Sequence, residues 1–86
     1  MATGSEVPRK VSVQLTIKLF AGFQRGRFAI ETRAFPGSPT VGEIVDALAI
    51  PRPEVGVMMV NGRNVEFDDR PAEGSVLAIF PVIGGG

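Results

Sequence analysis

Hydrophobic and polar side chains alternate near the start of the chain. Every second residue from 11 to 19 is apolar: Val11, Val13, Leu15, Ile17 and Leu19. A period of two is typical of a β-strand that buries one face. After a short connection bounded by Gly22 and Gly26, the run at 27–34 predicts a second strand with Phe28 and Ile30 on one face. The economical pairing of the two strands is an antiparallel hairpin.

The period then changes, and a single helix is predicted. Its apolar residues recur at helical spacing and form one stripe: Val41, Ile44, Val45 and Leu48. Thr40 and Glu43 fit a capping box, in which each side chain satisfies a free backbone N–H of the other. Gly42 in the first turn costs about 1 kcal/mol relative to alanine. Pro51 and Pro53 end the helix.

The second half of the chain predicts three more strands. The first is 57–60, and the Asn61-Gly62 pair after it favours a tight turn with positive φ at both positions. A short returning strand follows at 64–67. The last strand, 75–80, is almost continuously apolar, which is typical of a strand at the centre of a sheet.

The resulting order, ββαβββ, predicts an α+β fold in which one main helix covers one face of a mixed sheet. A right-handed crossover places the last strand beside the first and parallel to it. This arrangement is the β-grasp, or ubiquitin-like, fold. We expect a flexible segment at 1–10, one domain at 11–80 and a flexible glycine tail at 81–86.

Composition excludes several classes of site. Nine basic and nine acidic residues give a net charge of zero, which argues against nucleic acid as a partner. The sequence contains no cysteine and no histidine, so thiolate metal sites, cysteine nucleophiles and histidine bases are excluded. No apolar run reaches the roughly 20 residues of a membrane span, and the first residues do not form a secretory signal. We therefore expect a cytoplasmic protein without a membrane partner.

The last residues, Gly84-Gly85-Gly86, follow an apolar strand and give the fold nothing to pack. A tail without side chains can thread into another protein's active site and present its terminal carboxylate there. Gly86 is therefore the candidate reacting residue, with Gly85 beside it. A frayed terminus is the alternative interpretation.

Several motifs together resemble one protein family. They are the Asn61-Gly62 turn, Glu73-Gly74 before the last strand, the ending Phe-Pro-x-aliphatic-x-Gly-Gly at 80–86, and the segments 18–21 and 40–43. Across residues 11–86 the chain is similar to the MoaD/ThiS family of ubiquitin-like sulfur carriers. That family includes the small subunit of molybdopterin synthase and the sulfur carrier of thiamine biosynthesis.

The resemblance implies that the chain is not itself an enzyme but a cosubstrate or small subunit. An adenylating partner related to ubiquitin-activating enzymes would use ATP to activate the Gly86 carboxylate. A sulfur donor would then form a thiocarboxylate, and an acceptor enzyme, such as a synthase large subunit, would take the sulfur. The chain itself would bind no cofactor and no metal.

Strand parity predicts a partner surface. If Leu77 and Ile79 face the helix, Phe80 lies on the open face of the sheet. Met59 and Phe20 are expected on the same face, and Pro81 is expected to stiffen the exit of the tail. Exposed aromatic and methionine side chains usually mark partner contacts.

Two other functions use the same sequence features. The chain could be a protein modifier, attached through Gly86 to lysines as ubiquitin is. It could also be a β-grasp interaction module whose tail carries no chemistry.

Overall fold

The computed structural model describes residues 12–82, and residues 1–11 and 83–86 lie outside this range. The expected flexible segment at 1–10 is therefore not tested, nor is most of the expected tail. The elements run in the order β1 Ser12–Leu19, η2 Ala21–Gln24, β2 Ile30–Pro36, α1 Val41–Ala47, η3 Arg52–Glu54, β3 Val55–Val60, β4 Arg63–Asn64 and β5 Val76–Pro81.

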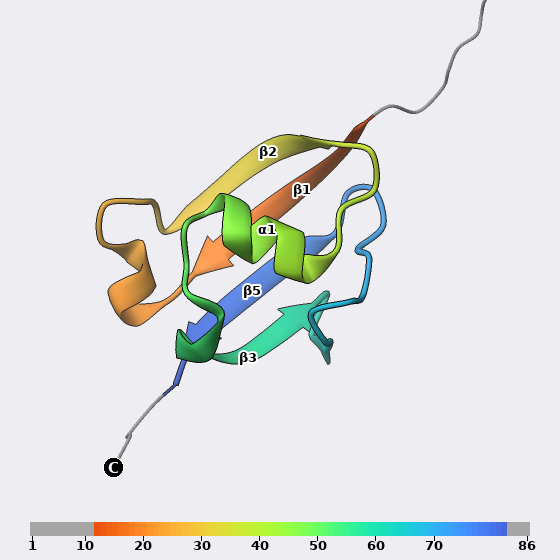
Figure 1. Ribbon diagram of the computed structural model, residues 1–86. Helices are drawn as coiled ribbons and strands as arrows, with labels where there is room; N and C mark the ends of the chain where they lie inside the picture. The colour runs from red at the N-terminus through yellow and green to blue at the C-terminus, as the bar shows by residue number, and fades with distance from the viewer. Residues whose placement is uncertain (1–11, 83–86) are drawn as a thin grey trace, which may run out of the picture.

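The strands form one mixed sheet in the order β2-β1-β5-β3-β4 (Figure 1). β1 and β2 pair antiparallel as the expected hairpin. β5 lies between β1 and β3, parallel to β1 with Ile17 opposite Leu77 and Leu19 opposite Ile79, and antiparallel to β3. The predicted β-grasp fold and the central place of the last strand are confirmed.

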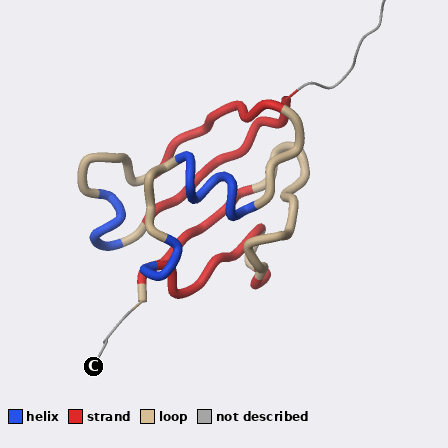
Figure 2. The backbone as a smooth tube through the Cα atoms, in the orientation of Figure 1, coloured by secondary structure: helices blue, strands red, loops and turns tan. Residues whose placement is uncertain are grey.

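The hydrophobic core fills the space between one face of the sheet and α1 (Figure 2). The alternate residues of β1 and β5 supply its centre, and several are completely inaccessible to solvent: Leu15, Ile17, Leu77 and Ile79. The helix contributes Val41, Ile44 and Val45, which are equally inaccessible. The period-two and helical patterns of the sequence thus meet in a single core.

Side chains cap both ends of α1 by hydrogen-bonding to backbone groups there. At its start, the Thr40 Oγ accepts a hydrogen bond from the Glu43 N–H at 3.1 Å, and the Glu43 carboxylate accepts one from the Thr40 N–H at 2.8 Å, so the predicted capping box is present. At its end, the Arg27 guanidinium donates to the carbonyls of Leu48 and Ala49, each at 2.9 Å. Cations stabilise this end of a helix because its carbonyls lack intrahelical partners.

Gly42 lowers the intrinsic helix propensity of α1, but its lack of a side chain leaves space for the Arg52 guanidinium. A Cβ at position 42 would come within 2.6 Å of the Arg52 guanidinium. That guanidinium forms two hydrogen bonds to the Asp46 carboxylate, at 2.9 and 3.0 Å, and lies over the Phe67 ring at 5.0 Å. The hydrogen bonds from Arg52 lower the pKa of Asp46 below its ordinary value. The missing side chain at position 42 thus leaves space beside α1 for this partly exposed guanidinium.

The outer strands differ from the sequence prediction. β2 begins at Ile30 rather than at 27, and Ile30 is 59% exposed because it pairs with Lys18 on the open face. Antiparallel partners share a face, so Phe35 opposite Val13 takes the core position instead. Phe28 packs against the core from outside the strand, so the expected shared face of Phe28 and Ile30 is wrong.

β3 and β4 also begin or end at residues other than those predicted from the sequence. β3 extends back to Val55, and β4 covers only Arg63–Asn64, since the Asp69 carboxylate accepts the Glu66 N–H at 2.7 Å and turns the chain away. The tight turn between these strands is confirmed, with φ of 51° at Asn61 and 83° at Gly62.

Replacing Leu77 with alanine should lower the free energy of unfolding by about 2–5 kcal/mol, because the side chain lies fully inside a packed core. Chemical denaturation measures the change. Val57→Ala is the matched control on the neighbouring strand: Val57 is 45% exposed, and its truncation should have a much smaller effect. Equal losses from the two substitutions would contradict the assignment of the two sheet faces.

Candidate functional site: the open sheet face and the chain exit

The open face of the sheet carries the side chains that do not enter the core. On β5, Leu77 and Ile79 are completely buried under the helix, whereas Ala78 and Phe80 are only partly covered. On β3, Met58 points inward and Met59, opposite Ala78, points to the open face. The parity argument for Phe80 and Met59 is therefore consistent with the structure.

Phe20 joins this face by continuing β1 for one residue. Its backbone is extended, with φ −127° and ψ 152°, before the 3₁₀ turn η2 begins. Since Leu19 lies opposite Ile79, the next residues along the two parallel strands meet as well. The rings of Phe20 and Phe80 stack with centroids 4.2 Å apart and planes at 12°. Such a pair stabilises by about 0.5–1.5 kcal/mol beyond its buried area.

An apolar groove lies beside this aromatic stack. Its lining comes from β3 and the end of β5: Val55, Gly56, Val57, Met59, Phe80, Pro81 and Val82. Three of the site residues expected from the sequence, Phe80, Met59 and Pro81, thus line a single surface, and Phe20 lies next to it. Val57 and Val82 are 45% and 56% exposed, a large exposure for apolar side chains. Contiguous apolar surface of this kind indicates contact with another macromolecule.

The chain leaves the domain at one corner of this groove. Pro81 is the last residue of β5, paired with Val55, so the strand extends one residue past the expected limit. Beyond it, the Val82 N–H donates to the Glu54 carbonyl at 2.9 Å. These contacts fix the start of the C-terminal segment on the rim of the groove. Gly85 and Gly86 lie outside the described residues, so their predicted role stays a prediction.

Gly56 is a site residue that the sequence reasoning missed. It lies at a β-bulge between Val55 and Val57, and a Cβ there would come within 2.7 Å of the Pro81 carbonyl oxygen. No side chain fits this close approach of two backbones. A lone glycine inside a predicted strand is the available sequence signal, because it is typical of a bulge or a close backbone contact.

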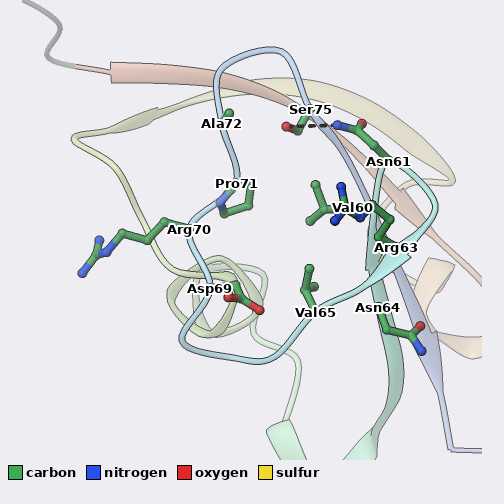
Figure 3. A pocket seen from close by; sticks show the side chains of 10 residues that line it. All are labelled: Val60, Asn61, Arg63, Asn64, Val65, Asp69, Arg70, Pro71, Ala72 and Ser75. Carbon is green, nitrogen blue, oxygen red and sulfur yellow. Dashed lines mark hydrogen bonds between the residues drawn. The ribbon is translucent and has the colours of Figure 1, made fainter.

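A second pocket lies at the other end of β3 and β5, around the Asn61-Gly62 turn (Figure 3). Several of its polar groups form hydrogen bonds within the domain. The Asn61 side-chain oxygen accepts the Val76 N–H at 2.9 Å, and its amide nitrogen lies 3.5 Å from the buried Ser75 hydroxyl. Arg70 points away from the pocket in Figure 3, and its guanidinium donates to the Ser38 carbonyl. These contacts hold the turn and the start of β5 together.

Within residues 12–82, no cluster of three or more acidic residues is placed to hold a metal ion. In the same range, no helix is long and apolar enough to span a membrane.

Comparison with known proteins identifies the family. Residues 10–84 match the Mut7-C ubiquitin family, and because this match covers most of the chain, the protein belongs to that family. A comparison with curated proteins finds no match.

Solved structures share the fold over nearly their whole length. A Pyrococcus furiosus protein assigned as subunit 1 of a molybdopterin converting factor is 23% identical, with a TM-score of 0.67, and covers 83% of this chain and 99% of that chain. The small archaeal modifier protein 1 of Haloferax volcanii is 27% identical, with a TM-score of 0.65, and covers 85% and 99%. The HVO 2177 protein of the same organism is 23% identical, with a TM-score of 0.69, and covers 95% and 94%. The likeness to the ubiquitin-like MoaD/ThiS proteins is confirmed.

Replacing Gly56 with alanine should displace the end of β5, because the new methyl group would overlap the Pro81 carbonyl. We expect a loss of about 1–3 kcal/mol in the free energy of unfolding and amide chemical-shift changes concentrated at 54–56 and 80–82. Gly22→Ala is the control, since a Cβ there meets no atom within 4 Å. If Gly56→Ala leaves the shifts of residues 80–82 unchanged, the close approach does not fix the exit.

Proposed function

We propose that this protein is a small sulfur carrier and not an enzyme. In this role the C-terminal carboxylate of Gly86 is adenylated and then converted to a thiocarboxylate. The observation that carries the proposal is the continuity between the apolar groove and the chain exit at Pro81 and Val82. In a ubiquitin-like fold, a partner that docks on this groove receives the following residues, 83–86, at its own active site. The likeness to ubiquitin-like carriers and modifiers supports this interpretation.

The chemistry begins with an unreactive carboxylate. Its oxygen attacks the α-phosphate of ATP in an adenylating partner related to ubiquitin-activating enzymes, and pyrophosphate leaves. The mixed anhydride now has AMP as a good leaving group. Sulfide released by a donor attacks the acyl carbon and displaces AMP, which gives the thiocarboxylate. The acceptor enzyme would then use this sulfur in cofactor biosynthesis, of the molybdopterin, tungstopterin or thiamine type.

In this role, the chain positions its own C-terminal carboxylate and provides the surface that the partner recognises. Glycines at 84–86 leave no side chain to obstruct a narrow passage to the nucleotide. Neither ATP nor the sulfur donor is proposed to bind this chain, because both belong to the partner's site. The proposal places the protein in the cytoplasm, where ATP and the adenylating partner would be available.

A protein modifier is the second candidate. The same acyl adenylate would be attacked by a lysine amine of a target protein instead of by sulfur, and an isopeptide bond would form. The 27% identity to the small archaeal modifier protein 1 of Haloferax volcanii favours this candidate. The mass of the intact protein purified from its own cells separates the two. A species heavier by the difference between sulfur and oxygen indicates the carrier, and conjugates to other proteins indicate the modifier.

Deleting Gly86, or adding a bulky residue after it, should abolish ATP–pyrophosphate exchange with the cognate activating enzyme. The melting temperature should stay nearly unchanged, because glycine has no side chain to bury and the buried core cluster is built from residues 13–79. Normal exchange by the deleted form would rule out both the carrier and the modifier, and would leave a β-grasp interaction module.

Replacing Phe80 with alanine should weaken binding to the activating enzyme by about tenfold or more, because an aromatic side chain at the centre of a docking surface carries much of the affinity. Its stability loss should be well below that of Leu77→Ala, since the ring is only partly covered. Isothermal titration calorimetry measures the affinity. Thr32→Ala, on the open face of β2 and away from the groove, is the control and should bind normally.

A further inference from the structure

β2 is the outer strand of the sheet on the side away from β3. In Figures 1 and 2 no other element of the described chain runs along its outer side. A strand of seven residues with one free edge presents unpaired backbone groups that can pair with another chain. The question is which chain fits this edge.

The backbone groups that face outward follow from the hydrogen bonds to β1. The Leu19 N–H donates to the Ala29 carbonyl at 2.9 Å. In an antiparallel pair, every second residue bonds inward, so Glu31 and Arg33 also bond to β1. The N–H and C=O groups of the alternate residues, Ile30, Thr32 and Ala34, therefore point outward. Pro36 has no N–H and ends the usable edge.

The side chains between them carry opposite charges. Glu31 and Arg33 lie on either side of Thr32, and both are about two-fifths exposed, with 42% and 36% of the side-chain surface accessible. Their charged groups are 3.3 Å apart within the strand. Charges on an edge normally discourage pairing. Here, however, their positions are symmetric about Thr32, so the edge is complementary to itself.

We propose that two copies of the chain associate through antiparallel pairing of their β2 edges around a twofold axis at Thr32. In this register Thr32 exchanges both backbone hydrogen bonds with Thr32 of the second copy. Ile30 pairs in the same way with Ala34 of the second copy. Glu31 lies directly opposite Arg33 of the second copy, in the closer type of cross-strand pair, where opposite charges stabilise.

Neighbouring registers are disfavoured by the same charges. A shift of the axis by one residue toward the N-terminus places Glu31 opposite Glu31, and a shift toward the C-terminus places Arg33 opposite Arg33. Like charges directly opposite each other destabilise a strand pair. The sequence of β2 therefore selects the register centred on Thr32.

This assembly is compatible with use of the groove. A twofold axis perpendicular to the sheet reverses the strand direction but keeps both open faces on one side. The groove lies across β1 and β5 from β2. Both copies would thus present their grooves and chain exits, with the exits at opposite ends of the combined sheet. The pairing rests on the edge alone and does not depend on the proposed carrier function.

Sedimentation velocity of the full chain tests the proposal. The interface is small, so we expect a reversible dimer whose population rises with protein concentration up to about 1 mM. Glu31→Arg and Arg33→Glu each place like charges opposite each other, and each should raise the dimer dissociation constant about tenfold. An equimolar mixture of the two variants restores opposite charges across the interface and should recover association. The double variant Glu31→Arg/Arg33→Glu should also dimerise.

Two further measurements keep the test independent of folding. Thr32→Pro removes an outward N–H and the exposed hydroxyl contact with Thr16, while leaving the backbone hydrogen bonds to β1. The melting temperature should therefore change little, and the dimer should be lost. In a half-labelled sample, an intermolecular nuclear Overhauser effect should join the Hα of Glu31 to the Hα of Arg33 of the second copy. A monomer up to about 1 mM, or single variants that dimerise like the original chain, would overturn the proposal.

Discussion

The parallel pairing of β1 with β5 is the interaction on which the rest of the structure depends. The two strands lie at the centre of the sheet, although more than fifty residues separate them in the chain. Their inward side chains, among them Ile17 and Leu77, are completely buried, and α1 covers them. Parallel pairing requires a crossover, and the capped helix lies within that crossover. Without this pair, the sheet would divide into the β1–β2 hairpin and a separate group of β5, β3 and β4.

The same pair also builds the candidate site. A strand has two faces, and each residue that enters the core fixes the direction of the next one. With Leu19 and Ile79 buried side by side, Phe20 and Phe80 must emerge together on the opposite face, where they stack. The core packing therefore determines the surface geometry. A change of one residue in register would bury the aromatic pair and expose the core.

Local sequence signals predicted the features that depend on local physics. The capping box at Thr40, the turn at Asn61-Gly62 and the open-face position of Phe80 each follow from a few neighbouring residues. These are residues whose conformation is set by the hydrogen bonds of their own segment or by strand period. The order of the elements and the right-handed crossover predicted the β-grasp fold as a whole, and the likeness to MoaD/ThiS proteins agrees with it.

Features that join distant segments were not predictable in the same way. Arg27 caps a helix end more than twenty residues away, and nothing in its neighbours indicates that contact. Helix propensity alone makes Gly42 unfavourable, and its neighbours in sequence do not indicate that the Arg52 guanidinium lies beside it. The period of two predicts a shared face for Phe28 and Ile30 only if both lie in the strand, whereas β2 begins at Ile30 and leaves Phe28 outside it.

The bonded start of the C-terminal segment reduces the number of residues that a docking partner has to order. Pro81 lies in β5 and Val82 is bonded to Glu54, so the partner need not order these two residues. Ordering each backbone residue costs about 1–2 kcal/mol, and this cost is already met within the fold. Four residues follow Val82 in the sequence, and a fully extended chain of that length spans about 14 Å. In the proposed carrier role, the nucleotide site that receives Gly86 would lie within that distance of the groove, or the partner would first break the hydrogen bond between Val82 and Glu54.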